Sequence, residues 1–220
     1  MSVDKFPIFD ARLKHPFSLL CAGASQSGKT TFLYNLLRNA SRLIDIEFEY
    51  IVIFIGTEDS IFENLRPFFK GRLDIIQGLP ESFDPFIDKS KAGLFIIEDL
   101  MRQSAEDIRV GDIFTKRGHH ENLSICLVLQ NLFSRGKERI TCFRSSHYIV
   151  VFRNPLDSTV IFSLAQKLEP SKRKRATEML NNIVTKYRYV LLDGKLDTPD
   201  QARYRSDIFG PVQRCFFLLR

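Results

Sequence analysis

The chain has 220 residues, 44% of them hydrophobic, with 20 Phe and no Trp, which supplies enough apolar surface for one sizeable core. Its four cysteines lie far apart without CxxC spacing, which argues against a secreted disulfide scaffold. No run approaches about 18 consecutive apolar residues, and residues 1–17 have no signal-peptide core. We therefore expect one intracellular domain over residues 1–220, without a membrane-spanning segment.

The net charge of +6 and the isoelectric point near 9.2 favour an anionic partner, although a modest excess of this size also serves solubility. The distribution of the positive charge is more informative than its sum. We interpret the basic run at Lys172–Arg175 as the solvated face of a helix. Other basic residues gather within residues 134–139 and at Arg203, Arg205, Arg214 and Arg220.

Seven apolar runs of strand length alternate along the chain with longer patterns of helical period. Several runs are apolar at consecutive positions, which is what strands covered on both faces require. The alternation predicts an α/β fold of the doubly wound class, with a mainly parallel central sheet flanked by helices on both faces. The expected strands cover residues 17–23, 49–56, 72–78, 93–99, 123–130, 147–152 and 187–193.

Start signals mark several helices between these strands. The dipeptide Asn154-Pro155 supplies a side-chain cap and a first-turn proline, and Asp157 adds a carboxylate, which together predict a helix over residues 156–168. Pro170 starts the next helix in the same way. An earlier helix has one apolar face, formed by Phe32, Leu33, Leu36 and Leu37.

The segment CAGASQSGKTTFLYNLL, residues 21–37, contains the pattern G-x-x-x-x-G-K-[ST] between an apolar run and a helical pattern, which is the context that this motif demands. Glycines let the backbone N–H groups face inward around phosphate oxygens, and the helix N-terminus adds further donors. Lys29 would neutralise the β- and γ-phosphates, and the Thr30 hydroxyl would help to hold Mg²⁺. The predicted phosphate-binding residues are Gly23, Ala24, Ser25, Gln26, Ser27, Gly28, Lys29, Thr30 and Thr31.

The segment GLFIIEDLM supplies the carboxylates that a phosphate loop needs. Its apolar run ends in Glu98 and Asp99, at the strand edge where α/β sheets place their ligands. One carboxylate would face the Mg²⁺ shell and the other would face the attacking water.

A third strand, LSICLVLQN, ends in amide side chains. Gln130 at its tip is able to contact the γ-phosphate and a water molecule together, and so to sense hydrolysis. A dedicated strand between the phosphate-loop strand and the acidic strand, with this polar tip, favours a motor-type ATPase over a small-molecule kinase.

Histidines and cysteines suggest no metal site besides Mg²⁺. His119, His120, Cys126, Cys142 and His147 match no zinc spacing, and no Ser/His/Asp signature is present. We expect the segment FTKRGHHENLSI to form a turn into the third strand, with its basic and imidazole groups near the nucleotide edge or a neighbouring subunit.

These motif blocks together resemble one family. The segments GASQSGKTTF, LFIIEDLM, FTKRGHHENLSICLVLQNLF, SSHYIVVFRNPLD and YVLLDGKLDTPDQARYRSDIF are similar to the poxvirus-type DNA-packaging ATPases of large DNA viruses and virus-like transposons, within the FtsK/HerA superfamily. The resemblance covers residues 17–209. It implies a RecA-like P-loop NTPase fold with Walker A and Walker B motifs, in a ring-forming ATPase that moves double-stranded DNA into a preformed capsid.

The resemblance also implies roles for individual residues. Lys29 and Thr30 would bind phosphate and Mg²⁺, and Gln130 would sense the γ-phosphate. Glu98 and Asp99 would form the acidic pair, with Glu98 assigned to Mg²⁺. Most members of the superfamily have Asp then Glu, or two Asp, at this place, so which of the two carboxylates holds the metal stays open.

Ring ATPases of this type complete each site with an arginine from the adjacent subunit. Arg117 is the first candidate because it precedes the sensor strand, and Arg144 and Arg153 are the alternatives. Lys and Arg on loops would hold the DNA backbone, for which residues 102–118 are the first candidate segment and residues 134–139 the second.

The sequence therefore predicts a Mg²⁺-dependent, DNA-stimulated ATPase that packages a viral genome, with ATP and Mg²⁺ as cofactors. Expected partners are double-stranded DNA, bound without sequence specificity, capsid proteins, and further copies of the chain in a pentameric or hexameric ring. The expected location is the host cytoplasm or nucleus at sites of virion assembly, or the virion itself. Two alternatives are a nucleotide-dependent assembly scaffold that does not move DNA and a small-molecule phosphotransferase.

Overall fold

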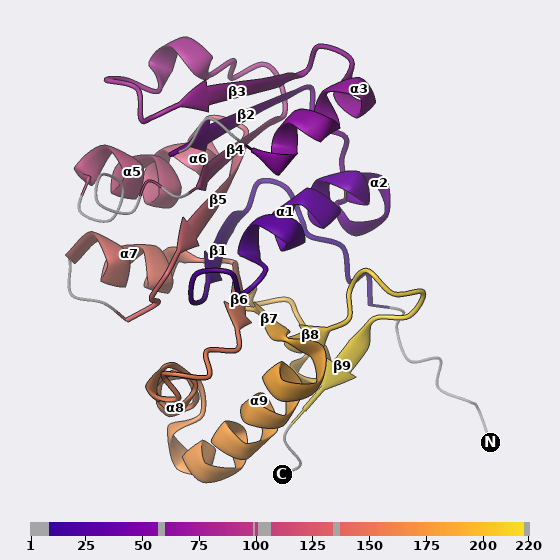
Figure 1. Cartoon of the computed structure of the whole chain (residues 1–220), viewed down its shortest axis with the longest axis vertical. Coiled ribbons are helices and arrows are strands. Elements are labelled where there is room, and N and C mark those ends of the chain that lie inside the picture. Colours follow the sequence, from indigo (N-terminus) through magenta and orange to yellow (C-terminus); the bar gives the residue numbers. More distant parts are fainter. Residues whose placement is uncertain (1–8, 57–59, 99, 101–106, 134–136, 218–220) are drawn as a thin grey trace.

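The computed structural model describes residues 9–56, 60–98, 100, 107–133 and 137–217, and its strands join in one sheet. The nine strands are β1 (Ser18–Ala22), β2 (Tyr50–Ile55), β3 (Leu73–Gln77), β4 (Gly93–Glu98), β5 (Leu123–Leu129), β6 (Tyr148–Phe152), β7 (Tyr189–Asp193), β8 (Tyr204–Ser206) and β9 (Arg214–Phe216). Their order across the sheet is β3-β2-β4-β5-β1-β6-β7-β8-β9 (Figure 1). The first seven strands lie where the sequence predicts them, whereas β8 and β9 were not predicted.

Helices cover both faces of this sheet, as the sequence predicts (Figure 1). One face carries α1 (Lys29–Arg38), α2 (Ala40–Leu43) and α3 (Arg66–Phe69). The other face carries α5 (Ile108–Asp112), α6 (Gly118–His120), α7 (Lys137–Ser145), α8 (Thr159–Leu168) and α9 (Arg173–Tyr187). Short helical turns complete the described chain: η1 (Ile61–Leu65), η2 (Asp84–Phe86), η3 (Ile113–Arg117), η4 (Pro170–Lys172) and η5 (Asp200–Ala202).

Strand direction divides the sheet into two parts. Strands β1 to β6 pair in parallel, and β7, β8 and β9 extend the sheet beyond β6 with antiparallel pairing. Strand β5 lies between β1 and β4, which confirms the predicted inserted strand. Because parallel strands end at the same edge, the carboxyl ends of β1, β2, β4 and β5 meet there.

Alternate residues of each strand pack into two hydrophobic clusters, one on each face of the sheet. In β1, Leu20 and Ala22 belong to the cluster beneath α5, α8 and α9, whereas Leu19 and Cys21 belong to the cluster beneath α1. Burying one such leucine side chain stabilises the fold by about 1.5–3 kcal/mol. Both faces of the central strands are therefore apolar, which explains their continuous apolar runs.

Two predicted boundaries are wrong. The helix expected over residues 156–168 begins at Thr159, because Asn154 and Asp157 use their side chains in turns that accept the backbone N–H groups of Leu156 and Thr159, at 3.1 and 2.9 Å. Residues 114–120, the first part of the segment 114–125 that was expected as a turn, lie in the helical segments η3 and α6. The late start of α8 thus results from side chains that bond to backbone N–H groups. In η3, the burial of Ile113 and Phe114 favours the helical form.

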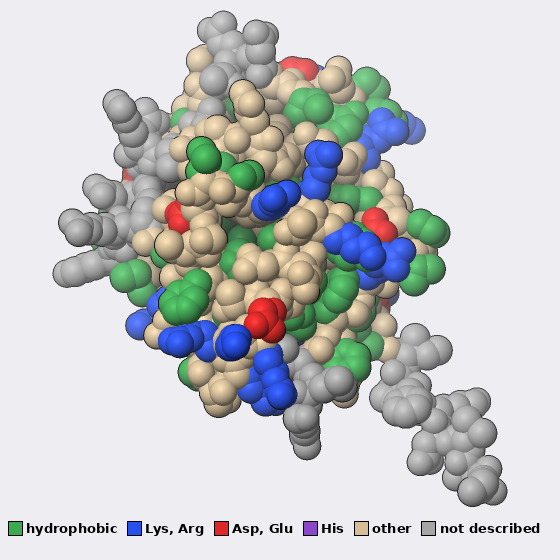
Figure 2. Space-filling view, turned by 60° about the horizontal axis from the view of Figure 1, so that its bottom comes forward, with side chains coloured by type: hydrophobic (Ala, Val, Ile, Leu, Met, Phe, Trp, Pro, Cys, Tyr) green, Lys and Arg blue, Asp and Glu red, His purple; other side chains and the backbone are tan. Residues whose placement is uncertain are grey.

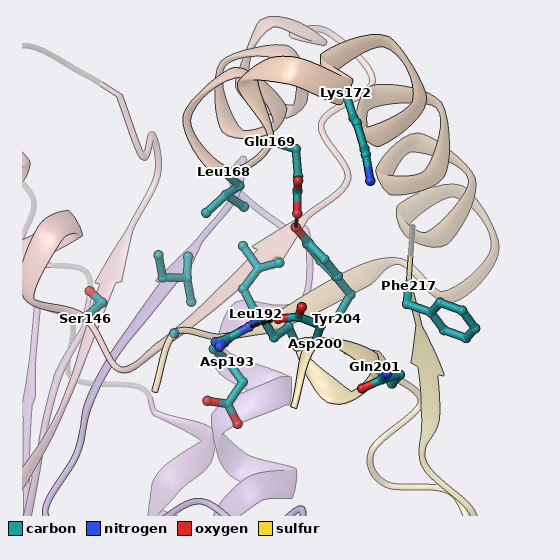
Figure 3. A pocket seen from close by; sticks show the side chains of 13 residues that line it. Ser146, Leu168, Glu169, Lys172, Leu192, Asp193, Asp200, Gln201, Tyr204 and Phe217 are labelled. Carbon is teal, nitrogen blue, oxygen red and sulfur yellow. Dashed lines mark hydrogen bonds and ion pairs between the residues drawn. The ribbon is translucent and has the colours of Figure 1, made fainter. Parts of the chain in front are cut away.

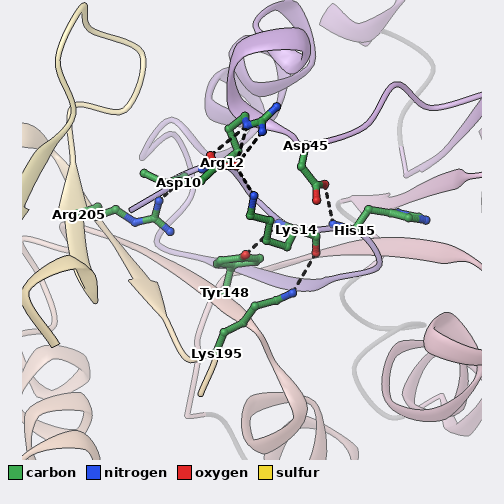
Figure 4. A network of polar contacts seen from close by, with 9 residues as sticks. Asp10, Arg12, Lys14, His15, Asp45, Tyr148, Lys195 and Arg205 are labelled. Atoms are coloured by element: carbon green, nitrogen blue, oxygen red, sulfur yellow. Dashed lines mark hydrogen bonds and ion pairs between the residues drawn. The ribbon is translucent and has the colours of Figure 1, made fainter. Parts of the chain in front are cut away.

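The segment before β1 is tied to the antiparallel part of the sheet (Figure 4). The Arg205 guanidinium donates to the Ala11 carbonyl and forms an ion pair with Asp193 at 2.7 Å, and both side chains are at most 3% exposed. The Tyr148 hydroxyl accepts the Lys14 backbone N–H at 3.0 Å, and Lys195 Nζ donates to the Lys14 carbonyl at 3.2 Å. These bonds join residues at opposite ends of the described chain.

The same ion pair corrects the interpretation of the basic residues near the end of the chain. Arg205 is buried, and Arg203 and Arg214 also form ion pairs, with Asp200 at 3.1 Å and with Asp207 at 3.4 Å. Arg220 lies outside the described residues. The three described arginines are therefore largely neutralised within the fold and add little to a surface for an anionic partner. Among the described helices, none is long and apolar enough to cross a bilayer.

Candidate nucleotide-binding site

Residues 23–28 form a tight loop between β1 and α1. Its backbone enters the left-handed region at Gln26, with φ 61°, and at Gly28, with φ 104°. A Cβ at Gly23 would lie 2.7 Å from Phe152 Cβ and from Ser27 Oγ, closer than real contacts allow. Both glycines of the motif are therefore required by the shape of the loop: Gly28 by its φ angle and Gly23 by the lack of space.

Lys29 begins α1 and folds back onto the loop. Its side chain is buried, and Nζ donates to the carbonyls of Gly23 at 2.8 Å and Ala24 at 2.7 Å. The ammonium group is therefore held against the loop backbone. A lysine at this place is able to exchange a carbonyl contact for a phosphate oxygen, which carries more negative charge.

The N-terminus of α1 is suited to an anion. Gly28 offers no side-chain cap, and the first turn has no acidic residue, so the orphan amides keep their partial positive charge. The Ser27 Oγ atom is buried and has no hydrogen-bond partner among the described residues. These unmet donors at one helix start fit a phosphate group.

Two oxygen ligands meet beside this helix start. The Thr30 hydroxyl donates to Glu98 Oε1, and Glu98 is 7% exposed at the carboxyl end of β4. A hydroxyl and a carboxylate are hard oxygen ligands of the kind that Mg²⁺ prefers, so these two residues fit the predicted metal. Asp99, the second predicted carboxylate, lies outside the described residues. The described residues contain no group of three or more His, Cys, Asp and Glu that could hold another metal ion.

A cavity of about 440 Å³ joins these groups at the carboxyl edge of the sheet. It brings together four residues from three predicted motifs, namely Lys29, Thr30, Glu98 and Gln130. Gln130 follows β5 and is exposed, as a strand-tip residue facing a ligand would be. The rest of the lining is Ser25, Gln26, Thr31, Ile55, Gly56, Ser60, Ile61, Val128 and Leu129.

Sequence reasoning missed one wall of this cavity. Ile55, Gly56, Ser60 and Ile61 come from the end of β2 and the segment after it, and Ile61 is 39% exposed. The sequence does indicate that β2 is another parallel strand whose carboxyl end lies at this edge. It does not give the order of the strands, which is needed to show that β2 lies beside β4.

The candidate arginines lie at different edges of the sheet. Arg117 ends η3, before β5, and forms ion pairs with Glu121 at 3.1 Å and with Asp84. Arg144 is exposed on α7, before β6, so both lie toward the amino ends of the strands, whereas Arg153 directly follows β6 at the carboxyl edge. The role of Arg117 toward a neighbouring subunit stays a prediction.

The neighbourhood of Arg117 is a network of charges. Its guanidinium group lowers the pKa of the Asp84 carboxyl below the usual value. His120 and the rest of the segment that precedes β5 share this position at the amino ends of the strands. Of the two expected positions for this segment, the nucleotide edge is therefore wrong, and the contact with a neighbouring subunit stays a prediction. The physical reason is that a segment leading into a parallel strand lies at the edge opposite to the one where the strand ends.

A second cavity of about 670 Å³ lies at that opposite edge, between the end of α8, the turns η4 and η5, and strands β6 to β8 (Figure 3). Several of its polar groups are paired with one another: the Tyr204 hydroxyl donates to Glu169 at 3.2 Å, and Arg203 pairs with Asp200 at 3.1 Å. It contains no residue of the phosphate loop. The larger cavity is therefore not where the predicted nucleotide chemistry gathers.

Comparisons with known proteins agree with this architecture. No protein-family model and no curated protein matches the chain. Similar solved structures include the genome packaging NTPase B204 from Sulfolobus turreted icosahedral virus 2. Its complex with AMPPCP has a TM-score of 0.56 and 11% identity, covering 93% of this chain and 99% of that one.

Two further complexes of that protein give the same result. The sulfate complex has a TM-score of 0.53 and 10% identity, covering 81% of this chain and 91% of that one. The ATP-gammaS complex has a TM-score of 0.53 and 11% identity, covering 83% and 94%. At this identity the likeness shows the fold, which is that of a P-loop NTPase with one antiparallel edge. The three structures are complexes of one viral genome-packaging NTPase, which is the class of protein that the sequence resemblance implies.

Proposed function

We propose that this chain is an ATP-hydrolysing motor that moves double-stranded DNA into a viral capsid. The observation that carries the proposal is the meeting of Lys29, Thr30, Glu98 and Gln130 in one cavity, with β5 between the phosphate-loop strand and the acidic strand. The fold of a viral genome-packaging NTPase supports the same assignment.

The residues divide the work of hydrolysis. Lys29 and the α1 amides bind the phosphates of ATP, and Thr30 and Glu98 would hold Mg²⁺, which when bound supplies positive charge to the β- and γ-phosphates. The Gln130 amide orients the γ-phosphate and the attacking water from the tip of β5. Asp99 is the partner that would polarise this water.

Strand β5 gives the site a route to the rest of the protein. It pairs with β1 and with β4, which lead to the phosphate and metal ligands. A displacement of Gln130 on hydrolysis would therefore be transmitted to both of these strands. At its other end β5 follows the segment with Arg117, which we propose as the arginine that completes the site of a neighbouring subunit in a pentameric or hexameric ring.

The test is steady-state ATP hydrolysis by the purified chain, with and without long double-stranded DNA, over a series of salt concentrations. A motor that binds the DNA backbone shows stimulation that fades as salt rises, and the Lys29→Ala variant hydrolyses ATP about 10²- to 10³-fold more slowly. Hydrolysis that ignores DNA at every salt concentration contradicts the motor. In that case, activity that requires an added small acceptor identifies a phosphotransferase, and stimulation by capsid protein alone identifies an assembly scaffold.

A further inference from the structure

Most of the net positive charge of the chain lies in one segment. Residues 167–188 contain seven Lys or Arg and two Glu, which gives this segment +5 of the net charge of +6. The segment comprises the end of α8, η4 and α9 and the residue after it. We name its seven cations the α9 basic surface: Lys167, Lys172, Arg173, Lys174, Arg175, Lys186 and Arg188.

These cations differ from many others in the molecule because they are not neutralised. Within the described residues, none of the seven forms an ion pair, whereas Arg66, Lys91 and Arg109 are examples of surface cations elsewhere that do. Six of the seven are exposed, and Lys172 is half-buried and points toward the second cavity (Figure 3). Their charge is therefore directed to solvent.

Four of the cations crowd the start of α9. A helix N-terminus carries partial positive charge and is stabilised by acidic residues, yet this first turn has no acidic residue and the cap residue, Lys172, makes no side-chain cap. Residues 170–175 also line a shallow hollow of about 570 Å³. The arrangement costs stability in the isolated protein and suits an anion that lies across the helix start.

The surface lies at the end of the molecule formed by α8 and α9. Figure 2 turns this end forward, and several Lys and Arg side chains with few acidic ones gather on it. The guanidinium group of Arg173 lies 4.9 Å from the centre of the Phe162 ring. The arginine therefore covers part of this apolar side chain. An exposed, basic and largely polar surface of this kind fits a string of phosphates better than an apolar partner.

We propose that the α9 basic surface binds the phosphate backbone of double-stranded DNA. The inference rests on the proposed function and places the DNA contact on α9, in addition to the loop segments that the sequence suggested. Flexible Lys and Arg side chains without a shaped pocket neutralise phosphates without selecting bases, as sequence-independent packaging requires. The residues of the α9 basic surface do not line the nucleotide cavity, so this contact is separable from hydrolysis.

The test compares two charge-matched variants by fluorescence anisotropy with a duplex of about 30 base pairs, between about 50 and 200 mM salt. The first is Lys174→Gln with Arg175→Gln, which removes two exposed cations of α9. The control is Lys70→Gln with Lys91→Gln, which removes two exposed cations near β3 and β4. Thermal melting of both checks that they are folded.

We expect the α9 variant to bind DNA about tenfold more weakly at about 0.1 M salt, and its plot of log K against log salt to flatten by about 2. Its hydrolysis without DNA stays that of the wild type, and more DNA is needed for half-maximal stimulation. The control variant should change far less in DNA affinity, in salt slope and in the DNA concentration needed for half-maximal stimulation.

Two results overturn the inference. If the wild-type chain binds DNA and the α9 variant matches it in affinity and salt slope, the contact lies elsewhere, while the motor function stands. If the wild-type chain neither binds duplex DNA nor is stimulated by it, both the inference and the proposed function fail. Binding of the wild type to vesicles with anionic lipid, without DNA binding, would then assign the surface to a membrane.

Discussion

The parallel and the antiparallel parts of the sheet hold their buried charges in different ways. At the carboxyl edge of the parallel strands, Lys29 and Glu98 are buried but line a cavity that is open to a ligand. In the antiparallel part, Asp193 and Arg205 pair with each other and are at most 3% exposed. A buried charge beside a cavity is available for chemistry, whereas a buried charge enclosed by protein partners serves the fold.

The largest effect is expected from Asp193→Asn, which breaks the enclosed pair and leaves the Arg205 charge buried without compensation. Removing one partner of a buried ion pair costs about 3–5 kcal/mol of unfolding free energy. Urea unfolding measures this loss, and hydrolysis per folded molecule should stay unchanged below the transition. A loss under about 1 kcal/mol would show that the pair adds little to the fold.

Lys29→Ala should act in the opposite way, with a large effect on catalysis and a small one on stability. Losing a positively charged group from the phosphates lowers kcat by about 10²- to 10³-fold. Steady-state hydrolysis measures the loss. The thermal midpoint should move less than in Asp193→Asn, because Lys29 lines a cavity in which water can reach the Gly23 and Ala24 carbonyls that accept from its Nζ. Retention of more than about a tenth of the activity would remove Lys29 from its role.

Gly23→Ala should affect both properties to an intermediate degree. The new methyl group would lie 2.7 Å from Phe152 Cβ and Ser27 Oγ, so the loop or β6 must shift, at a cost of about 1–3 kcal/mol. Nucleotide titration should show weaker binding, and melting should show a lower midpoint. Gly71→Ala is a matched control because nothing lies within 4 Å of its added Cβ, although its φ of 83° adds some backbone strain. If both variants bind nucleotide alike, the contact with Phe152 has no part in shaping the loop.

The smallest effect at neutral pH is expected from Tyr189→Phe, which removes only the bond from the Ile208 N–H, worth about 1 kcal/mol. Burial raises the pKa of Tyr189 to about 12, so the folded chain keeps a proton that the unfolded chain releases from about pH 10. This contribution to stability is complete below pH 10 and is lost as the pH rises toward 12. The variant should therefore lose less stability than the wild type between these values, as measured by urea unfolding. Equal losses would contradict the shifted pKa.

Strands with apolar residues at consecutive positions were predictable, because burial on both faces leaves a continuous run. Strands β8 and β9 were not, since each has three residues and β8 contains Arg205, whose burial depends on a carboxylate in β7. The pairing of Arg205 with a distant carboxylate depends on the tertiary structure. The sequence alone therefore suggests that Arg205 lies on the surface.

The candidate site was predictable for a different reason. The phosphate loop and the two strand tips each carry a local pattern, and parallel strands must end at one edge. The wall formed by Ser60 and Ile61 has no such pattern, because it depends on the neighbour relation between β2 and β4. Local signals thus identified the chemical groups, while the shape of the cavity required the strand order.

The insertion of β5 has a consequence for how the chain matures during synthesis. The phosphate-loop strand is synthesised before both of its neighbours in the sheet, because Leu19 pairs with Cys126 on one side and with Tyr148 on the other. Neither neighbour exists until more than 100 further residues have been translated, since Cys126 follows Leu19 by 107 positions (126 minus 19). The nascent chain therefore carries a glycine-rich loop that has no cavity to shape and cannot yet be stabilised by nucleotide. Such long-range pairing also makes folding slow compared with helical proteins of similar size.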